Sequence, residues 1–194
     1  WAPATTSHFF LTQVLNEANL STKDLEHVAM SSDNGGAAFA AGKLDAAVTW
    51  EPWLSKAKEM KNGYVLISTK EKPVIDDVLF VRTETLQKRS KDIKKFLKAC
   101  FKAIDYWKKN PVEGNQIIAK NLNLPLKDVE DMLSGIRIMD YKDNMSFFGT
   151  EEKPGAIYKA YENCVDAWLN EGVIKAKSLP NESIDPSFIQ GLYN

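Results

Sequence analysis

The apolar positions of the first 82 residues alternate between two periods. Helical spacing predicts helices over residues 5–20, 31–42 and 51–63, each with polar or proline residues suited to its first turn. Short apolar runs between them, at 25–30, 46–50, 64–68 and 76–83, predict β-strands. Because short strands alternate with helices, we expect an α/β fold built on a βαβ-type sheet.

The pattern changes in the second half of the chain. Apolar residues at helical spacing predict a long helix over 90–109, followed by helices at 111–122, 124–136 and 155–172. The tail 183–194 suits a short helix or a loop. We therefore expect a sheet-containing first part followed by a mainly helical C-terminal segment, with the boundary near Asp76 and Asp77.

Composition excludes some classes of protein. The 194 residues carry a formal net charge of -1, which argues against a nucleic-acid or membrane-surface partner that needs a clustered basic face. The lysine-rich stretch KRSKDIKKFLK has apolar positions at helical spacing, which predicts a solvated helix face. Cys100 and Cys164 fall within apolar helical stripes, so two buried thiols are favoured, although a disulfide between them stays open.

Catalytic and metal-binding patterns are missing from the sequence. His8 and His27 are the only histidines, and neither has a metal-ligand spacing. The adjacent Asp76 and Asp77 would point to opposite faces of a strand, which argues against a joint acid–base role. We expect a protein that is not an enzyme, with no catalytic residue, no metal and no cofactor.

Two helix starts are suited to binding. Thr6 and Ser7 open the first helix, where free backbone N–H groups and hydroxyls favour an anionic group. Asp33 and Asn34 open another helix in the same way. Simple helix capping explains both patterns equally well.

The stretch DAAVTWEPW places two indoles and a carboxylate at the end of an expected strand. Trp50 and Trp53 offer flat apolar walls to a ligand, and Glu51 offers an acceptor for an ammonium or amide group. The alternative is structural: one tryptophan packs under the helix and the other lies at the surface. The pair Gly35 and Gly36 favours close helix packing.

The order of these motifs carries a resemblance. The helix TTSHFFLTQVLNEANL, the stretch SSDNGGAAFAAGKLDAAVTWEPW, the run VLFVR and the helix ending in YWKKNP resemble the substrate-binding proteins of nitrate/sulfonate/taurine-type ABC importers. These belong to the type II periplasmic binding proteins. The resemblance implies two α/β lobes that close over a small ligand.

The same resemblance implies how the chain is divided. Residues 1–78 would form the second lobe, and residues 79–194 would return to the first lobe and add C-terminal helices. The N-terminal part of the first lobe has no counterpart, which suggests a fragment or a wall supplied by another chain. An incomplete first lobe would expose apolar surface and favour dimerisation or strand exchange.

The resemblance also implies ligand-binding residues. Thr6, Ser7 and His8 match the helix start that meets the anionic end of the ligand. Trp50, Glu51 and Trp53 match the turn that lines the cleft. Asp33 and Asn34 open the second helix, and Asp77 lies at the crossover between lobes.

The expected function is capture of a small organic, sulfonate-like ligand and its delivery to an ABC permease. The protein would act outside the cytoplasm, in a periplasm or anchored by lipid at the cell surface, without a nucleic-acid partner. One alternative is the ligand-sensing domain of a signalling receptor. Another is a thiamine-pyrimidine biosynthetic enzyme of the same fold, which needs iron and a histidine-bearing site.

Overall fold

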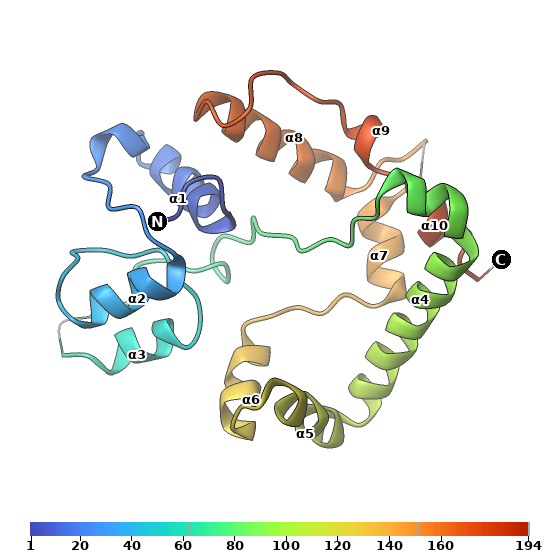
Figure 1. Ribbon diagram of the computed structural model, residues 1–194, viewed down its shortest axis with the longest axis horizontal. Coiled ribbons are helices and arrows are strands. Elements are labelled where there is room, and N and C mark those ends of the chain that lie inside the picture. The colour runs from blue at the N-terminus through green and yellow to red at the C-terminus, as the bar shows by residue number, and fades with distance from the viewer. Residues whose placement is uncertain (62, 151, 194) are drawn as a thin grey trace. The chain divides into compact units, whose positions relative to one another are not determined.

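The computed structural model describes residues 1–61, 63–150 and 152–193, and nearly all of its regular structure is helical (Figure 1). Within these residues the elements are α1 (Thr6–Glu17), η1 (Thr22–Asp24), α2 (Ser32–Ala40), α3 (Trp53–Glu59), α4 (Thr83–Lys109), α5 (Pro111–Leu122), α6 (Leu126–Ser134), α7 (Tyr141–Phe148), α8 (Ala156–Asn170), α9 (Pro180–Ser183) and α10 (Ser187–Gln190).

The chain divides into two compact units. Unit 1 consists of Trp1–Asp76 and Asn163–Ser178, and unit 2 consists of Asp77–Glu162 and Leu179–Asn194. Helix α8 contributes its first residues to unit 2 and the remainder to unit 1. The assignment of residues 1–78 and 79–194 to two lobes stays a proposal.

The prediction of a βαβ-type sheet is wrong. None of the four runs expected as strands forms a strand in the described residues, where the only β-bridge is an isolated one between Gly149 and Pro154. A strand is stable only when neighbouring strands bond its backbone and cover its side chains. These runs lack both kinds of support: the exposed fraction is 74% for Tyr64, 79% for Leu66 and 88% for Phe80. The fold class of an α/β protein with such a sheet is therefore corrected to a helical one.

The helices follow the sequence more closely. Helix α5 begins with Pro111 at its first position, and α6 begins directly after Pro125, where a missing N–H costs nothing. The long helix α4 starts seven residues before the expected Ser90, at Thr83, and has non-helical backbone angles at Arg89 (φ -133°, ψ 31°). The predicted apolar stripe therefore lies after this kink.

Unit 2 is held by an apolar core under α4. Phe101, Ile189 and Leu192 are buried together, and α7 packs against them through Tyr141 and Met145. The hydroxyl of Tyr141 donates to the Ile189 carbonyl at 3.2 Å, which ties α7 to α10. The C-terminal residues thus close the core that α4 begins.

Helix α7 was missing from the sequence-based prediction. Its N-cap is Asp140, whose carboxylate accepts the Asp143 N–H at 2.9 Å, while Asp143 accepts the Asp140 N–H in a capping box. The Lys108 ammonium also bonds Asp140 at 2.7 Å. The hydrogen bond from Lys108 and, to a smaller extent, the one from the Asp143 N–H lower the pKa of Asp140 to about 2.

Unit 1 joins α1 to the end of α8. The rings of Phe9 and Trp168 lie 6.0 Å apart, and the Thr22 hydroxyl donates to Glu171 at 2.9 Å. Lys72 forms an ion pair with Glu17 at the end of α1. Residues distant in the sequence thereby fix the position of α1 within the unit.

The described helices are too short or too polar to span a membrane. Within the described ranges, none combines the length and the apolar content that crossing a bilayer requires.

Candidate functional site

The N-terminal ends of α1 and α2 meet in unit 1. The hydroxyls of Ser7 and Ser32 lie 2.6 Å apart and are both buried, so they form one hydrogen bond between the two helix starts. Thr49, just before Trp50, donates its hydroxyl to the Ser32 carbonyl at 2.8 Å. The segment that precedes α3 is therefore held at the same place.

Both helix starts are capped by the residue before them. Thr5 accepts the His8 N–H at 3.4 Å, and Ser31 accepts the Asn34 N–H at 3.2 Å. The cap of α2 is thus Ser31, which precedes the helix start expected at Asp33 and Asn34. Capping uses one N–H group per helix, and the N–H groups of Thr6 and Ser7 have no acceptor among the described residues.

Trp53 is a packing residue. A Cβ added to Gly36 would clash with the Trp53 indole, so α2 and α3 approach closely only because Gly36 has no side chain. The indole N–H donates to Asp33 at 3.3 Å, and the Lys56 ammonium lies 4.1 Å from the ring centroid. This matches the structural alternative for one of the two tryptophans, and it gives Gly36, but not Gly35, the close packing expected of the glycine pair.

Trp50 and Glu51 differ from Trp53. Trp50 is 47% exposed, which leaves much of its indole accessible. Glu51 accepts the Ser55 N–H at 3.0 Å and so fixes the first turn of α3. Of the three residues in this turn, Trp50 is the one whose side chain is free to contact a ligand.

His8 is buried and both of its ring nitrogens have partners. Nδ1 accepts the Ala4 N–H at 3.2 Å, so the proton is on Nε2, which lies 3.3 Å from Glu171 Oε2. Ala4 has a φ of 57°, a left-handed conformation that is uncommon outside glycine. His8 therefore stabilises the turn that leads into α1, a role that competes with ligand contact.

The predicted site residues are therefore only partly assembled. Unit 1 brings together Thr6, Ser7, Asp33, Asn34, Trp50 and Trp53 around the adjoining ends of three helices. Asp77 is exposed and is the first residue of unit 2. Sequence reasoning missed Glu171, the partner of both His8 and Thr22, because no local pattern marks a contact across such a separation.

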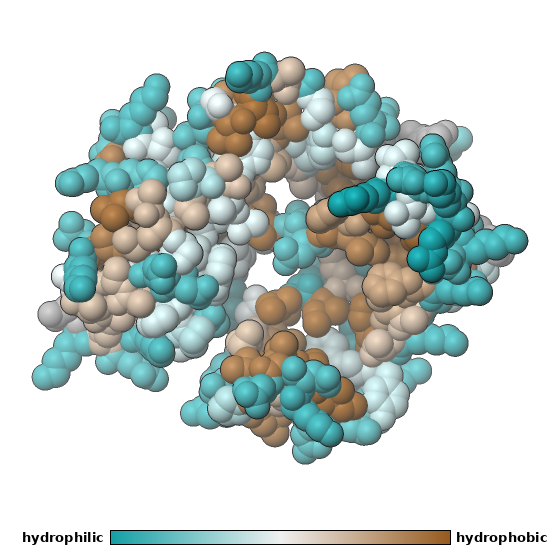
Figure 2. All heavy atoms as spheres, in the orientation of Figure 1, coloured by the Kyte–Doolittle hydropathy of each residue, from teal (hydrophilic) through white to brown (hydrophobic). Residues whose placement is uncertain are grey.

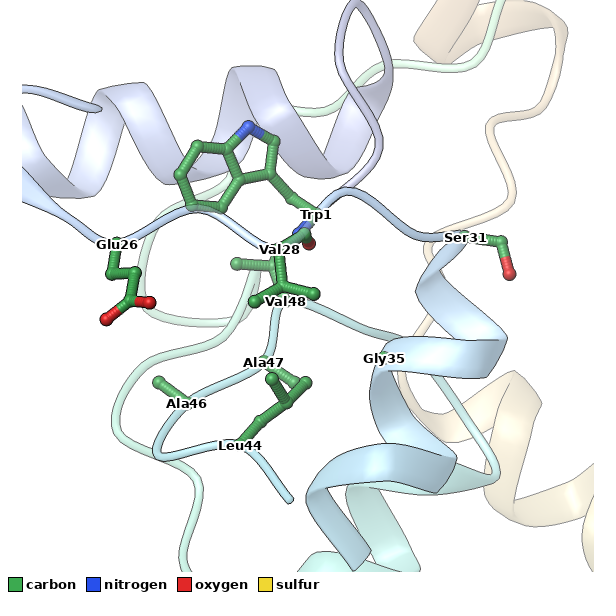
Figure 3. Close-up of a pocket in the computed structure, with 9 residues that line it drawn as sticks. All are labelled: Trp1, Glu26, Val28, Ser31, Gly35, Leu44, Ala46, Ala47 and Val48. Atoms are coloured by element: carbon green, nitrogen blue, oxygen red, sulfur yellow. The ribbon is translucent and has the colours of Figure 1, made fainter. Parts of the chain in front are cut away.

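Two small cavities lie beside this arrangement. The first holds about 60 Å³ between the segment 44–48 and α2, with Val28, Val48 and Leu44 gathered between the Trp1 ring and Gly35 (Figure 3). It has room for a few water molecules and none for an organic ligand, which needs several hundred Å³. No predicted site residue lines it.

The second cavity holds about 190 Å³ and is open to solvent. Its wall includes His8, Glu171 and the stacked rings of Trp1 and His27, whose centroids are 3.7 Å apart. The His27 Nε2 bonds the Trp1 carbonyl at 2.8 Å, so these polar groups already satisfy one another.

The described residues contain no grouped metal ligands and no disulfide. Across the described part of the chain, no three histidine, cysteine or acidic side chains are grouped to hold a metal ion. Cys100 and Cys164 are free thiols and half-buried, in place of the expected full burial. Burial raises the pKa of the Cys164 thiol, which makes it less reactive at neutral pH.

Comparison with models of protein families identifies the family of this chain. The model of the NMT1-like family matches residues 2–123, which is well over half of the sequence. The chain belongs to the NMT1-like family. The match includes both helix starts, the tryptophan-containing turn and the whole of α4. A comparison with individual curated proteins found no match.

Two solved structures resemble this NMT1-like chain. The periplasmic aliphatic sulphonate binding protein SsuA from Escherichia coli matches with a TM-score of 0.69 at 18% identity, over 95% of this chain and 57% of its own. The alkanesulfonate-binding protein SsuA from Xanthomonas axonopodis pv. citri, bound to MOPS, matches with a TM-score of 0.64 at 19% identity, over 93% of this chain and 60% of its own.

At these identities the likeness concerns the fold. This NMT1-like chain follows the backbone path of periplasmic binding proteins, although its described residues form no sheet. It spans less than two thirds of the length of either solved structure.

Proposed function

We infer that this chain belongs to the solute-binding component of an ABC importer and contributes the part of the binding site that holds a small organic anion. Its action is capture of a ligand and delivery to the permease, without chemical conversion. The observation that carries the proposal is the junction of α1 and α2 at Ser7 and Ser32, in a chain with the fold of two sulfonate-binding proteins.

The start of α1 is the better of the two anion sites. The first turn of α1 contains no acidic residue, and the N–H groups of Thr6 and Ser7 have no acceptor among the described residues. The first turn of α2 contains Asp33, whose carboxylate opposes a second anion. Because a helix N-terminus carries partial positive charge, a sulfonate or carboxylate head group is expected at Thr6 and Ser7.

The remainder of the ligand is expected to be apolar or cationic. Trp50 offers an exposed indole face close to the same junction. Asp33 is exposed and offers acceptor oxygens to an ammonium or amide group. An organic sulfonate that contacts Trp50 combines these features better than a bare inorganic anion does.

The same likeness supports a location outside the cytoplasm. The Escherichia coli structure is described as periplasmic, and a binding protein must meet its ligand outside the cytoplasm. We therefore propose that this chain acts outside the cytoplasm, with a permease in the membrane as its partner. Closure over the ligand and the lobe assignment of residues 1–78 and 79–194 belong to the same proposal.

A proline at the first position of α1 tests the anion site directly. Thr6→Pro removes one N–H group that has no intrahelical acceptor, and proline is favoured at this position after the extended Thr5 (φ -120°, ψ 170°). Loss of one hydrogen bond to a charged group should weaken sulfonate binding by roughly ten- to a hundredfold. Calorimetric titration with methanesulfonate, taurine and benzenesulfonate measures this change.

Thr83→Pro is the matched control. Thr83 is the first residue of α4 in unit 2, and the preceding Arg82 is also extended (φ -61°, ψ 136°). This variant should bind the sulfonates as the unchanged chain does. Equal weakening by both prolines, or no weakening by Thr6→Pro, would remove α1 from the site.

A further inference from the structure

A row of lysines follows one face of α4 after the kink at Arg89. Lys91, Lys95, Lys98 and Lys102 are spaced four, three and four residues apart, which places them on one face of the helix over about 16 Å. We call these four residues the lysine stripe. The most hydrophilic side chains in view gather over the first half of α4 (Figure 2).

The lysine stripe is directed away from the core of unit 2. The opposite face of α4 carries Phe101, Leu97 and Ile104, which pack on Ile189 and Leu192. Lys91, Lys95 and Lys102 are exposed, and Lys98 is half-buried with its ammonium 5.3 Å from the Tyr193 ring. The stripe is therefore available from solvent within its unit.

Few negative charges neutralise this face. Among the described residues, the four stripe lysines form no ion pair. Nearby acids already have basic partners: Glu84 pairs with Lys88, and Asp92 pairs with Arg89. Asp105, one turn beyond Lys102, is the remaining acid at the end of the stripe.

The composition of the stripe distinguishes among anionic partners. Protein interfaces are depleted in lysine and rely on buried aromatic and arginine anchors, and the stripe supplies neither. Nucleic-acid binding is favoured by a strongly basic domain, whereas the isoelectric point of this chain is near 6.2. Lysines on a flat, exposed helix face suit a diffuse anionic surface, where each contributes independently.

We propose that the lysine stripe of α4 docks unit 2 on an anionic phospholipid surface. The contact is electrostatic and peripheral, because the stripe contains no apolar side chain to insert into the bilayer. It is reversible and is weakened by salt, since exposed charges are screened within about 10 Å at ordinary ionic strength.

Vesicle sedimentation of the full chain tests this proposal. The vesicles contain either phosphatidylcholine alone or equal amounts of phosphatidylcholine and phosphatidylglycerol. We expect binding only to the second kind, and loss of that binding in high salt. The triple variant Lys91→Gln, Lys95→Gln, Lys102→Gln should bind roughly a hundredfold more weakly, since each lysine contributes about fivefold.

The matched control changes the same number of charges elsewhere in unit 2. Lys120, Lys127 and Lys142 are exposed and form no ion pair among the described residues, and their triple glutamine variant should bind within about threefold of the unchanged chain. Equal loss in both triple variants would reduce the effect to net charge and overturn the proposal. Absence of binding at low salt, or stripe-dependent binding to duplex DNA or polyglutamate in place of vesicles, would also overturn it.

Discussion

The two units differ in the polar side chains that they bury. The buried polar residues in the described part of the chain, Ser7, His8, Thr12 and Ser32, all belong to unit 1. Unit 2 buries apolar residues, with Phe101, Ile189 and Leu192 at its centre. Unit 1 also buries apolar residues, among them Phe9, Leu15 and Val165. A buried polar group stabilises a fold only when it has a hydrogen-bond partner, so unit 1 combines packing with directed hydrogen bonds, whereas the buried side chains of unit 2 are apolar among the described residues.

This difference suggests that the buried polar residues of unit 1 position the proposed anion site, whereas the buried residues of unit 2 mainly stabilise the fold. The polar contacts of unit 1 hold helix starts next to one another, which is the geometry that the proposed anion site needs. A protein commonly departs from an all-apolar interior where it binds ligands. The apolar core of unit 2 supports instead the rigid helix that presents the lysine stripe.

The largest expected effect is in the core of unit 2. Leu192 is 1% exposed, and Leu192→Ala removes its packing against Phe101 and Ile189. The free energy of unfolding should fall by about 3 kcal/mol, from lost apolar transfer and the cavity left behind. Urea unfolding followed by circular dichroism measures it. Leu179→Ala, at an exposed position of the same unit, should cost less than about 0.5 kcal/mol, and equal costs would contradict this account of the core.

A smaller effect is expected where α2 meets α3 in unit 1. Gly36→Ala forces a methyl group into the Trp53 ring and should cost about 2 kcal/mol through overpacking. Gly35→Ala meets only the Met30 side chain at 3.8 Å and gains helix propensity, so it should be neutral or stabilising by up to about 1 kcal/mol. Thermal unfolding of both variants compares them. A similar loss in each would mean that the Trp53 contact does not set the distance between the helices.

The smallest expected effect concerns the hydroxyl pair of unit 1. Ser7→Ala leaves the buried Ser32 hydroxyl without its partner and should cost about 1 kcal/mol in the ligand-free chain. The double variant Ser7→Ala, Ser32→Ala should cost less than the sum of the single variants, because no orphaned hydroxyl remains. A strictly additive double variant would show that the two hydroxyls do not interact.

The sequence predicted the helices better than it predicted whether strands would pair into a sheet. The apolar residues at helical spacing between Ile93 and Trp107 predicted most of α4, because helical periodicity is local and repeats over several turns. The run 76–83 indicated a strand by its apolar residues alone. Strand formation depends on partners that local sequence does not specify, and the described residues provide none.

The candidate site was predictable as a set of residues and not as an arrangement. Helix capping identified the starts of α1 and α2, since hydroxyl and acidic residues precede apolar runs there. The contact between Ser7 and Ser32 spans 25 residues, and the Trp53 contact with Gly36 required knowing how α3 folds back. Both are tertiary contacts without a local signal.

The net charge of a chain does not describe the charge of one helix face. A total of -1 over the chain argued against a clustered basic face, and the lysine-rich stretch suggested an ordinary solvated helix. Four lysines nevertheless share one face of α4, because helical geometry gathers residues that the sequence spaces apart. Local charge on a folded surface therefore has to be assessed separately from the sum.

The unit boundary within α8 leaves Trp168 with unit 1, and this gives the two units separate optical signatures. Of the five tryptophans, only Trp107 belongs to unit 2. Of the six tyrosines, only Tyr64 belongs to unit 1. Emission excited in the indole band thus reports chiefly on unit 1, and tyrosine bands resolved from the indole background by second-derivative absorption report chiefly on unit 2. The chain carries intrinsic labels with which the unfolding of each unit can be followed without any added probe.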